Sequence, residues 1–540
     1  MTAKDDLIKF LRSIDGRPYQ RYGEMARSYD LDGITLYADR VQNEMSSSSD
    51  MRVRISFARS GFPDDTHDSP VKEIALRDLI ARRFWESCRT FAKGGAHGGS
   101  IYIPRPGQEM LERSSVVFSR TFIEVRFRAS LPAAGRNAAG NAAVKMLTED
   151  LGEITKTSLF YNAYKQSKLY NHINTLITAR TIRSSLRERG LVGFVADGSV
   201  MPRREDGAAP MADAAPFSSP DALAVTFTKA DGTEVRGMGI PEGLTAVIGA
   251  TGQGKSTLMR ALAAGVYDHI PGDGRELVIT ADDAVEIYGD AGRTVRSVDV
   301  SLFMSDASRN TRSLSTDDAD RATSSAVSAS EAIEAGCRLL LMNDLNVHHG
   351  IMYRDAGIAA VIPKGDEVMI PVTEGLRGSD ISAVIVCRHM PEAADTMIIT
   401  SGHNAIGAIL RERAPKRNII MPADRIPMSR NMVLAKGRKE VSSVAVSVQR
   451  IEAGEKTITF PPQLADICQT AAVADALADS KDLMDGTVTL RDAAKRLEDT
   501  HRKRINSTDI NAGPDRAAFR MYDIAAVINR HPDIVFAQRS

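Results

Sequence analysis

The sequence has few of the features that are typical of secreted proteins, proteins with a structural metal site, or membrane-spanning proteins. Its 540 residues include four cysteines, none of them in a C-x-x-C pair. We therefore expect neither a disulfide framework nor a structural zinc site. No run of about 18 apolar residues occurs, and no basic-then-apolar segment opens the chain, so we expect no membrane span and no signal peptide. These absences predict a cytoplasmic protein with no membrane partner.

The chain also lacks an overall charge, because 69 Lys and Arg residues balance 69 Asp and Glu residues. Global charge therefore gives no argument for binding nucleic acid or a membrane surface, and a partner of either kind would have to meet a local patch. The length predicts about three domains, since single hydrophobic cores stop growing well below 540 residues.

One stretch, residues 244–257, carries the most specific pattern in the chain. It reads as a buried strand, a glycine-rich turn and a helix, and residues 249–256 match G-x-x-x-x-G-K-[ST]. In this motif backbone N–H groups cradle phosphates, Lys255 reaches the β- and γ-phosphates, and Ser256 ligates Mg²⁺. The helix start adds the positive end of its dipole. The pattern predicts that ATP and Mg²⁺ bind through Gly249, Ala250, Thr251, Gly252, Gln253, Gly254, Lys255, Ser256 and Thr257.

Two apolar strands further along end in polar residues. The first, 339–342, runs into Asn343 and Asp344, and the second, from 383, ends at His389. P-loop proteins place a Mg²⁺-binding carboxylate at the end of such a strand, so we predict a metal site made by Ser256, Asn343 and Asp344. A helix at about 323–335 precedes the first strand, with Asp318 or Asp320 as its N-cap.

This order of elements resembles that of ABC-type ATPases, and much of the chain is similar to the predicted ABC-class ATPase family. The resemblance is carried by the short motifs 14–17, 194–198, 237–241, 267–275, 331–336 and 354–355. It implies a central ABC-type P-loop domain. The apolar patterns on either side predict a mixed α/β N-terminal domain and a mostly helical C-terminal region, so the expected fold class is α/β. The resemblance also implies a homodimer formed around ATP, with Asp344 and His389 as the candidate catalytic residues.

The sequence departs from this family where hydrolysis would take place. The resemblance implies Asp-Glu after the first strand, but the chain has Asn343-Asp344. Asn343 carries no negative charge, and Asp344 falls roughly 1.5 Å short of a glutamate, a displacement that can cost ~10²-fold in rate. A register that makes Asp344 the Mg²⁺ residue leaves Leu345 in the glutamate's place. The loop at 317–325, which in ABC dimers contacts the opposite γ-phosphate, is acidic. Its candidate contacts are Arg321, Thr323 and Ser324.

Two N-terminal strands place arginines on one side. In both 52–57 and 121–129 apolar residues alternate with charged ones, so Arg52 and Arg54, like Arg126 and Arg128, leave the apolar face. If the strands are neighbours, these four residues form a basic platform that could contact RNA or DNA phosphates. The alternative is an ordinary solvated sheet face.

A second basic segment follows the nucleotide domain, between residues 411 and 439. It is either a solvated loop or a polyanion-binding surface. Helices are expected at about 462–479, 489–504 and 515–530. We predict domains at 1–190, 191–405 and 406–540. Three functions stay open: an ATP-dependent switch with weak hydrolysis, an active ATPase that remodels a partner, and a nucleic-acid-binding protein regulated by ATP.

Overall fold

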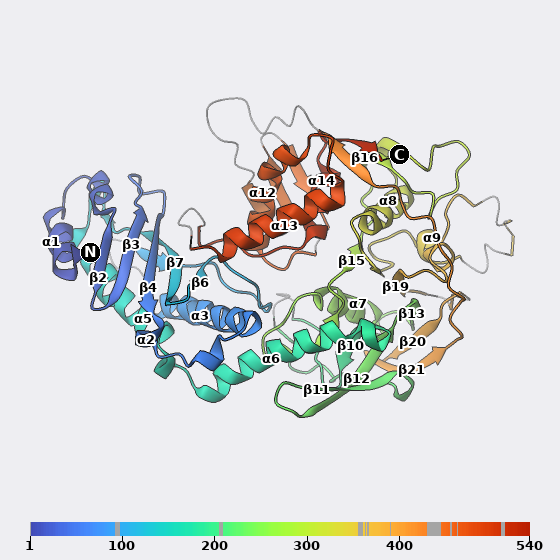
Figure 1. Cartoon of the computed structure of the whole chain (residues 1–540), viewed down its shortest axis with the longest axis horizontal. Helices are drawn as coiled ribbons and strands as arrows, with labels where there is room; N and C mark the ends of the chain where they lie inside the picture. Colours follow the sequence, from blue (N-terminus) through green and yellow to red (C-terminus); the bar gives the residue numbers. More distant parts are fainter. Residues whose placement is uncertain are drawn as a thin grey trace. The chain divides into compact units, whose positions relative to one another are not determined.

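In the computed structural model the chain forms two compact units (Figure 1). Unit 1 contains Met1–Leu176 and His501–Ala518, and unit 2 contains Ile177–Thr500 and Phe519–Ser540. The structure describes residues 2–91, 98–204, 209–354, 360–361, 363, 367–388, 390–391, 393–428, 444–453, 456–461, 463–508 and 513–539. Among these residues, no helix is both long enough and apolar enough to cross a membrane.

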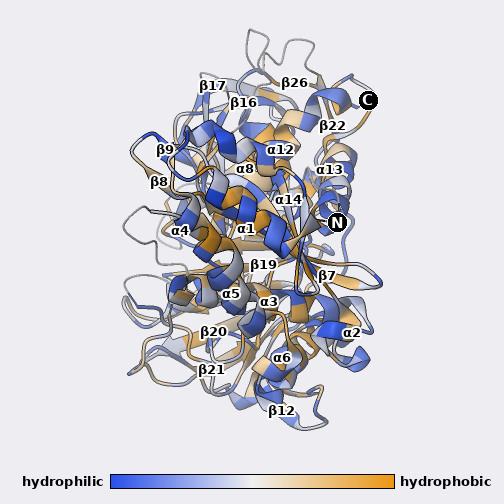
Figure 2. Cartoon of the chain, turned by 90° about the vertical axis from the view of Figure 1, so that its left-hand side faces the viewer, coloured by the Kyte–Doolittle hydropathy of each residue, from blue (hydrophilic) through white to orange (hydrophobic). Residues whose placement is uncertain are grey.

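Unit 1 is built on a seven-stranded sheet with the order β1-β2-β3-β4-β7-β5, in which β6 also pairs with β7. Apolar residues that alternate along the strands form its core. For example, Val53 of β4 and Val125 of β7 lie opposite each other and are fully buried. Helix α1 has an amphipathic pattern that buries Leu7 and Leu11 and leaves hydrophilic residues outside (Figure 2). The strands are Thr2–Ala3 (β1), Ser28–Leu31 (β2), Ile34–Arg40 (β3), Ser49–Ser56 (β4), Ser100–Tyr102 (β5), Val116–Phe118 (β6) and Phe122–Ser130 (β7), and the longer helices are Lys4–Ser13 (α1), Pro70–Phe91 (α3) and Leu151–Ser158 (α5).

Unit 2 contains two larger sheets. An antiparallel sheet has the order β11-β12-β10-β14, and a turn at Asp231-Gly232 joins β11 to β12. A six-stranded sheet has the order β15-β18-β19-β13-β20-β21, in which only β21 is antiparallel. The strands are Leu191–Ala196 (β10), Ala224–Thr228 (β11), Glu234–Pro241 (β12), Leu244–Ile248 (β13), Val278–Thr280 (β14), Ala284–Ile287 (β15), Leu339–Met342 (β18), Ser382–Val386 (β19), Thr396–Ser401 (β20) and Asn404–Leu410 (β21).

Helix α8 (Arg321–Glu334) covers one face of the six-stranded sheet. Its Ala326, Ala329 and Ile333 are buried in one cluster with Ile287 of β15 and Leu340 of β18. Asp320 caps the helix, as expected, because its carboxylate accepts the N–H of Thr323 at 2.8 Å. Helix α7 (Lys255–Ala264) packs against β15, β18 and β19.

The C-terminal part of the chain adds strands as well as the expected helices. The helices are Ile467–Asp479 (α12), Leu490–Asn506 (α13) and Met521–Arg530 (α14), and the strands are Arg425–Met428 (β22), Val444–Ser447 (β23), Arg450–Ala453 (β24), Lys456–Thr459 (β25) and Val535–Gln538 (β26). Strand β22 pairs with β26, and β23, β24 and β25 form a small antiparallel sheet. A further pair is made by Arg293–Val298 (β16) and Leu314–Ala319 (β17).

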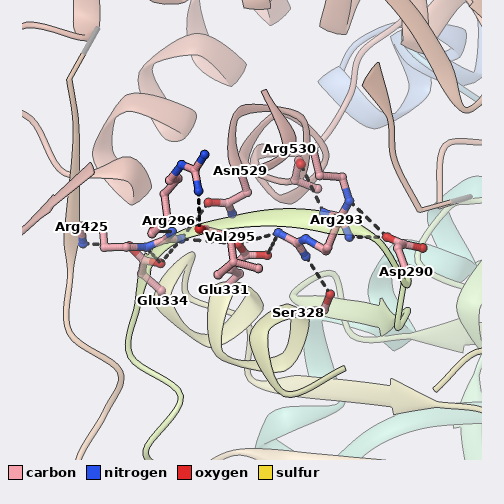
Figure 3. A network of polar contacts seen from close by, with 11 residues as sticks. Asp290, Arg293, Val295, Arg296, Ser328, Glu331, Glu334, Arg425, Asn529 and Arg530 are labelled. Atoms are coloured by element: carbon pink, nitrogen blue, oxygen red, sulfur yellow. Dashed lines mark hydrogen bonds and ion pairs between the residues drawn. The ribbon is translucent and has the colours of Figure 1, made fainter. Parts of the chain in front are cut away.

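The C-terminal end of α8 is held by a buried network of ion pairs (Figure 3). Glu334 accepts hydrogen bonds from Nε and Nη2 of Arg425 at 2.9 and 2.7 Å, and all these groups are buried. Glu331, one turn earlier, accepts from Nη2 of Arg293 at 2.8 Å. Arg425 also donates to Asn529 of α14 at 2.7 Å. The network therefore joins α8 to β16, β22 and α14.

We expect Glu334→Ala to lower the free energy of unfolding of unit 2 by about 3–5 kcal/mol, because it leaves the buried Arg425 guanidinium without its main carboxylate. The double variant Glu334→Leu with Arg425→Met should cost much less, since it removes both charges at once. Urea unfolding of the full chain measures the effect. The control is Lys416→Ala, which breaks an exposed ion pair with Asp380 and should leave the midpoint unchanged. An unchanged midpoint for Glu334→Ala would contradict the expectation.

Candidate functional site

The glycine-rich turn lies at the carboxyl end of β13, between that strand and α7. Gly249, Gly252 and Gly254 all have positive φ, at 152°, 79° and 92°. A Cβ on Gly249 would lie 2.4 Å from the carbonyl oxygen of Thr400, and one on Gly254 would lie 2.8 Å from the Cα of His403. Glycine is therefore required at these two positions both for conformation and for space.

Lys255 opens α7 and bends back over the turn. Its Nζ donates to the carbonyl oxygens of Gly249 and Ala250 at 2.7 and 3.0 Å. The turn itself is exposed at Thr251 and Gly252, whereas the apolar side of α7 is buried from Leu258 onward. This leaves backbone N–H groups and an ammonium group together at the open side of a helix start, which is the arrangement that suits a phosphate chain.

The other strand ends meet the turn because parallel strands share one carboxyl edge. Strand β19 lies between β13 and β18. Asn343, which follows β18, is 1% exposed, and its Oδ1 accepts from the backbone N–H of Leu345 at 3.3 Å and from the Ser256 hydroxyl at 3.4 Å. The Leu345 N–H can only donate, so it fixes the amide with its oxygen toward Ser256. The structure therefore brings together Ser256 and Asn343, two of the three residues of the predicted metal site, and metal binding by them stays a prediction.

Asp344 is brought to the same edge but is already paired. Its Oδ2 accepts from Nε of Arg388 at 3.0 Å, and the side chains of Asp344 and Arg388 are 13% and 71% exposed. The predicted catalytic His389 directly follows Arg388 and lies outside the described residues. Sequence reasoning missed Arg388, although its place beside the candidate histidine at a strand end was a signal.

A Mg²⁺ ion fits the chemistry of the donors at this edge, because hard divalent cations prefer oxygen ligands. The Ser256 hydroxyl and the Asn343 amide oxygen would hold it, with Asp344 next in the chain. When bound, it would neutralise charge on the phosphate oxygens. Among the residues that the structure describes, no cluster of three or more His, Cys, Asp or Glu side chains forms a ready metal site. The donor set is therefore poor in negative charge.

The three residues of the loop ahead of α8 differ in their exposure. Thr323 and Ser324 are buried in the first turn, and the Thr323 hydroxyl donates to its own cap, Asp320, at 2.9 Å. Arg321 is exposed, and its Nη2 donates to the carbonyl oxygen of Leu345 at 2.5 Å. Of the acidic residues expected to oppose a phosphate, Asp317 pairs with Arg296 at 2.6 Å. Only Arg321 of the three candidates presents its side chain outward.

The N-terminal arginines do lie on neighbouring strands, but inside a charge network. Arg52 is opposite Arg126 and Arg54 is opposite Glu124 in the β4–β7 pair. Glu124 is fully buried and accepts from all three arginines, at 2.8 Å from Arg52 and Arg126 and at 2.5 Å from Arg54. Unlike the exposed platform expected from the alternation, Arg52 and Arg126 are buried.

A segment from the end of the chain lies over the same side of unit 1. Arg126 donates to the carbonyl oxygen of Ser507, and Arg128 pairs with Asp515 at 2.8 Å. Arg126 is thus covered, whereas the side chain of Arg128 stays 36% exposed.

The second basic segment is also largely engaged with the protein. Arg413 lies 3.7 Å from Glu242, Lys416 pairs with Asp380 at 2.9 Å, and Arg417 donates to the carbonyl oxygen of Gly375 at 2.8 Å. Arg425 is buried in the α8 network. Arg411 donates to the carbonyl oxygen of Pro391 at 3.4 Å. The other cations of the segment, at 430, 436, 438 and 439, lie outside the described residues.

Three protein-family models together match most of the chain. Residues 165–419 match the P-loop domain of ABC ATPases, residues 4–162 match the N-terminal domain of ATPases of the ABC class, and residues 443–536 match the MRB1590 C-terminal domain. An uncharacterized protein of Methanocaldococcus jannaschii, MJ1628, is 30% identical over 169 residues, which are 30% of this chain and 37% of that protein.

A solved structure of a bacterial Atm1-family ABC exporter with ATP bound matches 51% of this chain and 47% of its own, at 12% identity and a TM-score of 0.21. The chain thus spans less than half of each of these two relatives. The consecutive matches to the N-terminal and P-loop models agree with the phosphate loop, the strand order and the resemblance seen in the sequence. The chain belongs to the ABC-class ATPases, a family of P-loop proteins.

Proposed function

We propose that this ABC-class P-loop protein binds ATP with Mg²⁺ and acts as a nucleotide-dependent switch that closes as a homodimer, with slow hydrolysis. The observation that carries the proposal is Asn343, a buried neutral amide 3.4 Å from the Ser256 hydroxyl at the place where the family resemblance implies an aspartate. The phosphate loop has its glycines, lysine and serine, so binding is supported while water activation is not.

Two features of the site reduce the negative charge available for hydrolysis. Asn343 supplies an oxygen but no charge, and the charge of Asp344 is partly neutralised by Arg388 at 3.0 Å. General-base assistance typically contributes 10²–10⁴-fold in rate, so a carboxylate that is both short and paired should be a poor base. The site therefore favours keeping ATP over cleaving it.

Closure as a dimer is supported by what stays exposed around the site. The turn at Thr251 and Gly252 is open to solvent, and so is Arg321 at the positively polarised start of α8. A second copy that brings its Arg321 to the phosphates of the first would complete both sites together. In the absence of ATP the same cations would repel one another.

We expect Lys255→Ala to weaken ATP binding at least ~10-fold, because it removes a charge-assisted contact to the phosphates. Equilibrium binding of a fluorescent ATP analogue to the full chain measures this. Lys229→Ala, a change of the same type on a surface turn, is the control and should bind as the wild type does. Equal affinity in the wild type and Lys255→Ala would show that the loop does not hold the nucleotide.

We expect the protein to bind ATP but to hydrolyse it slowly. We expect wild-type phosphate release at saturating ATP to stay below about 1 s⁻¹, and Asn343→Asp with Asp344→Glu to raise it at least ~10-fold by restoring charge and reach. Adding Lys255→Ala to that pair should abolish the gain. Wild-type turnover at or above the stated rate would instead favour an active ATPase that remodels a partner.

Sedimentation velocity tests the switch. The wild-type chain should sediment as a monomer alone and as a dimer with ATP and Mg²⁺, and Lys255→Ala should stay monomeric. Arg321→Glu should prevent the dimer, because the guanidinium that it replaces is expected to contact the nucleotide of the second copy. A dimer that forms equally with and without nucleotide would rule out a nucleotide-dependent closure.

A further inference from the structure

A pocket of about 300 Å³ lies beside the end of β18, on the side of Asp344. Four elements meet there: the ends of β18 and β19, the start of α8 and the short helix α9 (His349–Met352). The lining residues are Arg321, Asp344, Val347, His348, His349, Tyr353 and Arg388. Two guanidinium groups and two imidazoles thus face one carboxylate, so the pocket suits a small anion.

The two arginines approach the turn after β18 from different elements. Arg321 donates to the carbonyl oxygen of Leu345, and Nε of Arg388 donates to Asp344. Within the described part of the chain, the two terminal nitrogens of Arg388 have no hydrogen-bond partner, and its side chain is 71% exposed. A guanidinium held at Nε keeps a planar pair of terminal N–H donors, which matches the oxygens of a phosphate.

The histidine pair adds a hydrogen-bond donor without adding a further permanent positive charge. The rings of His348 and His349 are stacked, with centroids 4.5 Å apart. Nδ1 of His348 accepts the N–H of Gly350 at 3.2 Å, so a neutral ring carries its proton on Nε2. Burial, and then the nearby His349 and Arg321, lower the pKa of His348, so the ring is mainly neutral at pH 7. His348 can therefore donate to an oxyanion.

We propose that this pocket binds a phosphate anion, with Arg388 as its principal ligand and Arg321 and His348 as further donors. The pocket adjoins the nucleotide, since Asp344 directly follows Asn343 and Asn343 contacts Ser256 of the phosphate loop. Its occupant is either free inorganic phosphate or the terminal phosphate group of a bound ATP. This second source rests on the proposed function, whereas binding of inorganic phosphate does not.

The first experiment measures binding of inorganic phosphate to the full chain by isothermal titration. Arg388→Ala should lower phosphate affinity at least ~10-fold, and Arg388→Lys should retain part of it because a lysine keeps the charge but not the fork. Lys255→Ala should keep the Arg388-dependent binding of phosphate. Arg450→Ala is the matched control, since Arg450 is another exposed arginine paired with a carboxylate, that of Glu452 at 3.3 Å.

The outcomes separate the pocket from the phosphate loop. Phosphate affinity lost in Lys255→Ala but kept in Arg388→Ala would place the anion in the loop and overturn the proposal. So would a wild-type chain that binds no phosphate up to about 50 mM, a concentration far above the ~1 mM that corresponds to weak specific binding. Because the Lys255→Ala chain tests the pocket without nucleotide, a failure of the pocket and a failure of ATP binding are distinguishable.

A second arm identifies the source of the phosphate. If the pocket holds the terminal phosphate of bound ATP, Arg388→Ala should weaken ATP at least ~10-fold and leave ADP affinity unchanged. If it holds free phosphate, the ratio of ATP to ADP affinity should equal that of the wild type, while inorganic phosphate binding is still lost. Loss of ATP and ADP affinity to the same extent, with phosphate binding intact, would contradict both sources.

Discussion

The arrangement of unit 2 depends on one set of buried ion pairs, in which Glu331 and Glu334 of α8 contact Arg293 and Arg425. Four charged side chains are buried together, and each pairing offsets part of the free-energy cost of burying its two members. Burial raises the pKa of Glu334, and Arg425 opposes that rise. Since the arginines come from β16 and β22, neither carboxylate on α8 can be satisfied until these distant segments have packed against the helix.

The two ends of α8 connect this network to the site. At its C-terminal end the helix is held by ion pairs, and at its N-terminal end Asp320 caps it and Arg321 reaches the carbonyl oxygen of Leu345. Near the same end of α8, the Ser325 hydroxyl accepts a hydrogen bond from the backbone N–H of His348 at 3.1 Å. Helix α8 therefore joins the residue Arg321 to β16, β22 and α14 through one continuous set of contacts.

The parts of the site that could be predicted from the sequence are those coded by neighbouring residues. The phosphate loop, the strand ending at Asn343 and the cap at Asp320 all depend on spacing within a few positions. The ion pair between Arg388 and Asp344 depends instead on β18 and β19 being neighbours, which no local pattern states. The burial of Arg126 depends on the β4–β7 register and on residues near Ser507, far along the chain, so alternation alone suggested an exposed face.

Charge explains why one site can favour holding a nucleotide over cleaving it. A polyphosphate is attracted by the lysine, the helix start and the N–H groups of the turn, and a nearby carboxylate opposes that attraction while helping to activate water. At this edge Asn343 removes one carboxylate, and Arg388 offsets the other from 3.0 Å away. Under the proposed function, both features would make the potential at bound phosphates more positive, so the side chains that slow hydrolysis would also strengthen the binding of ATP.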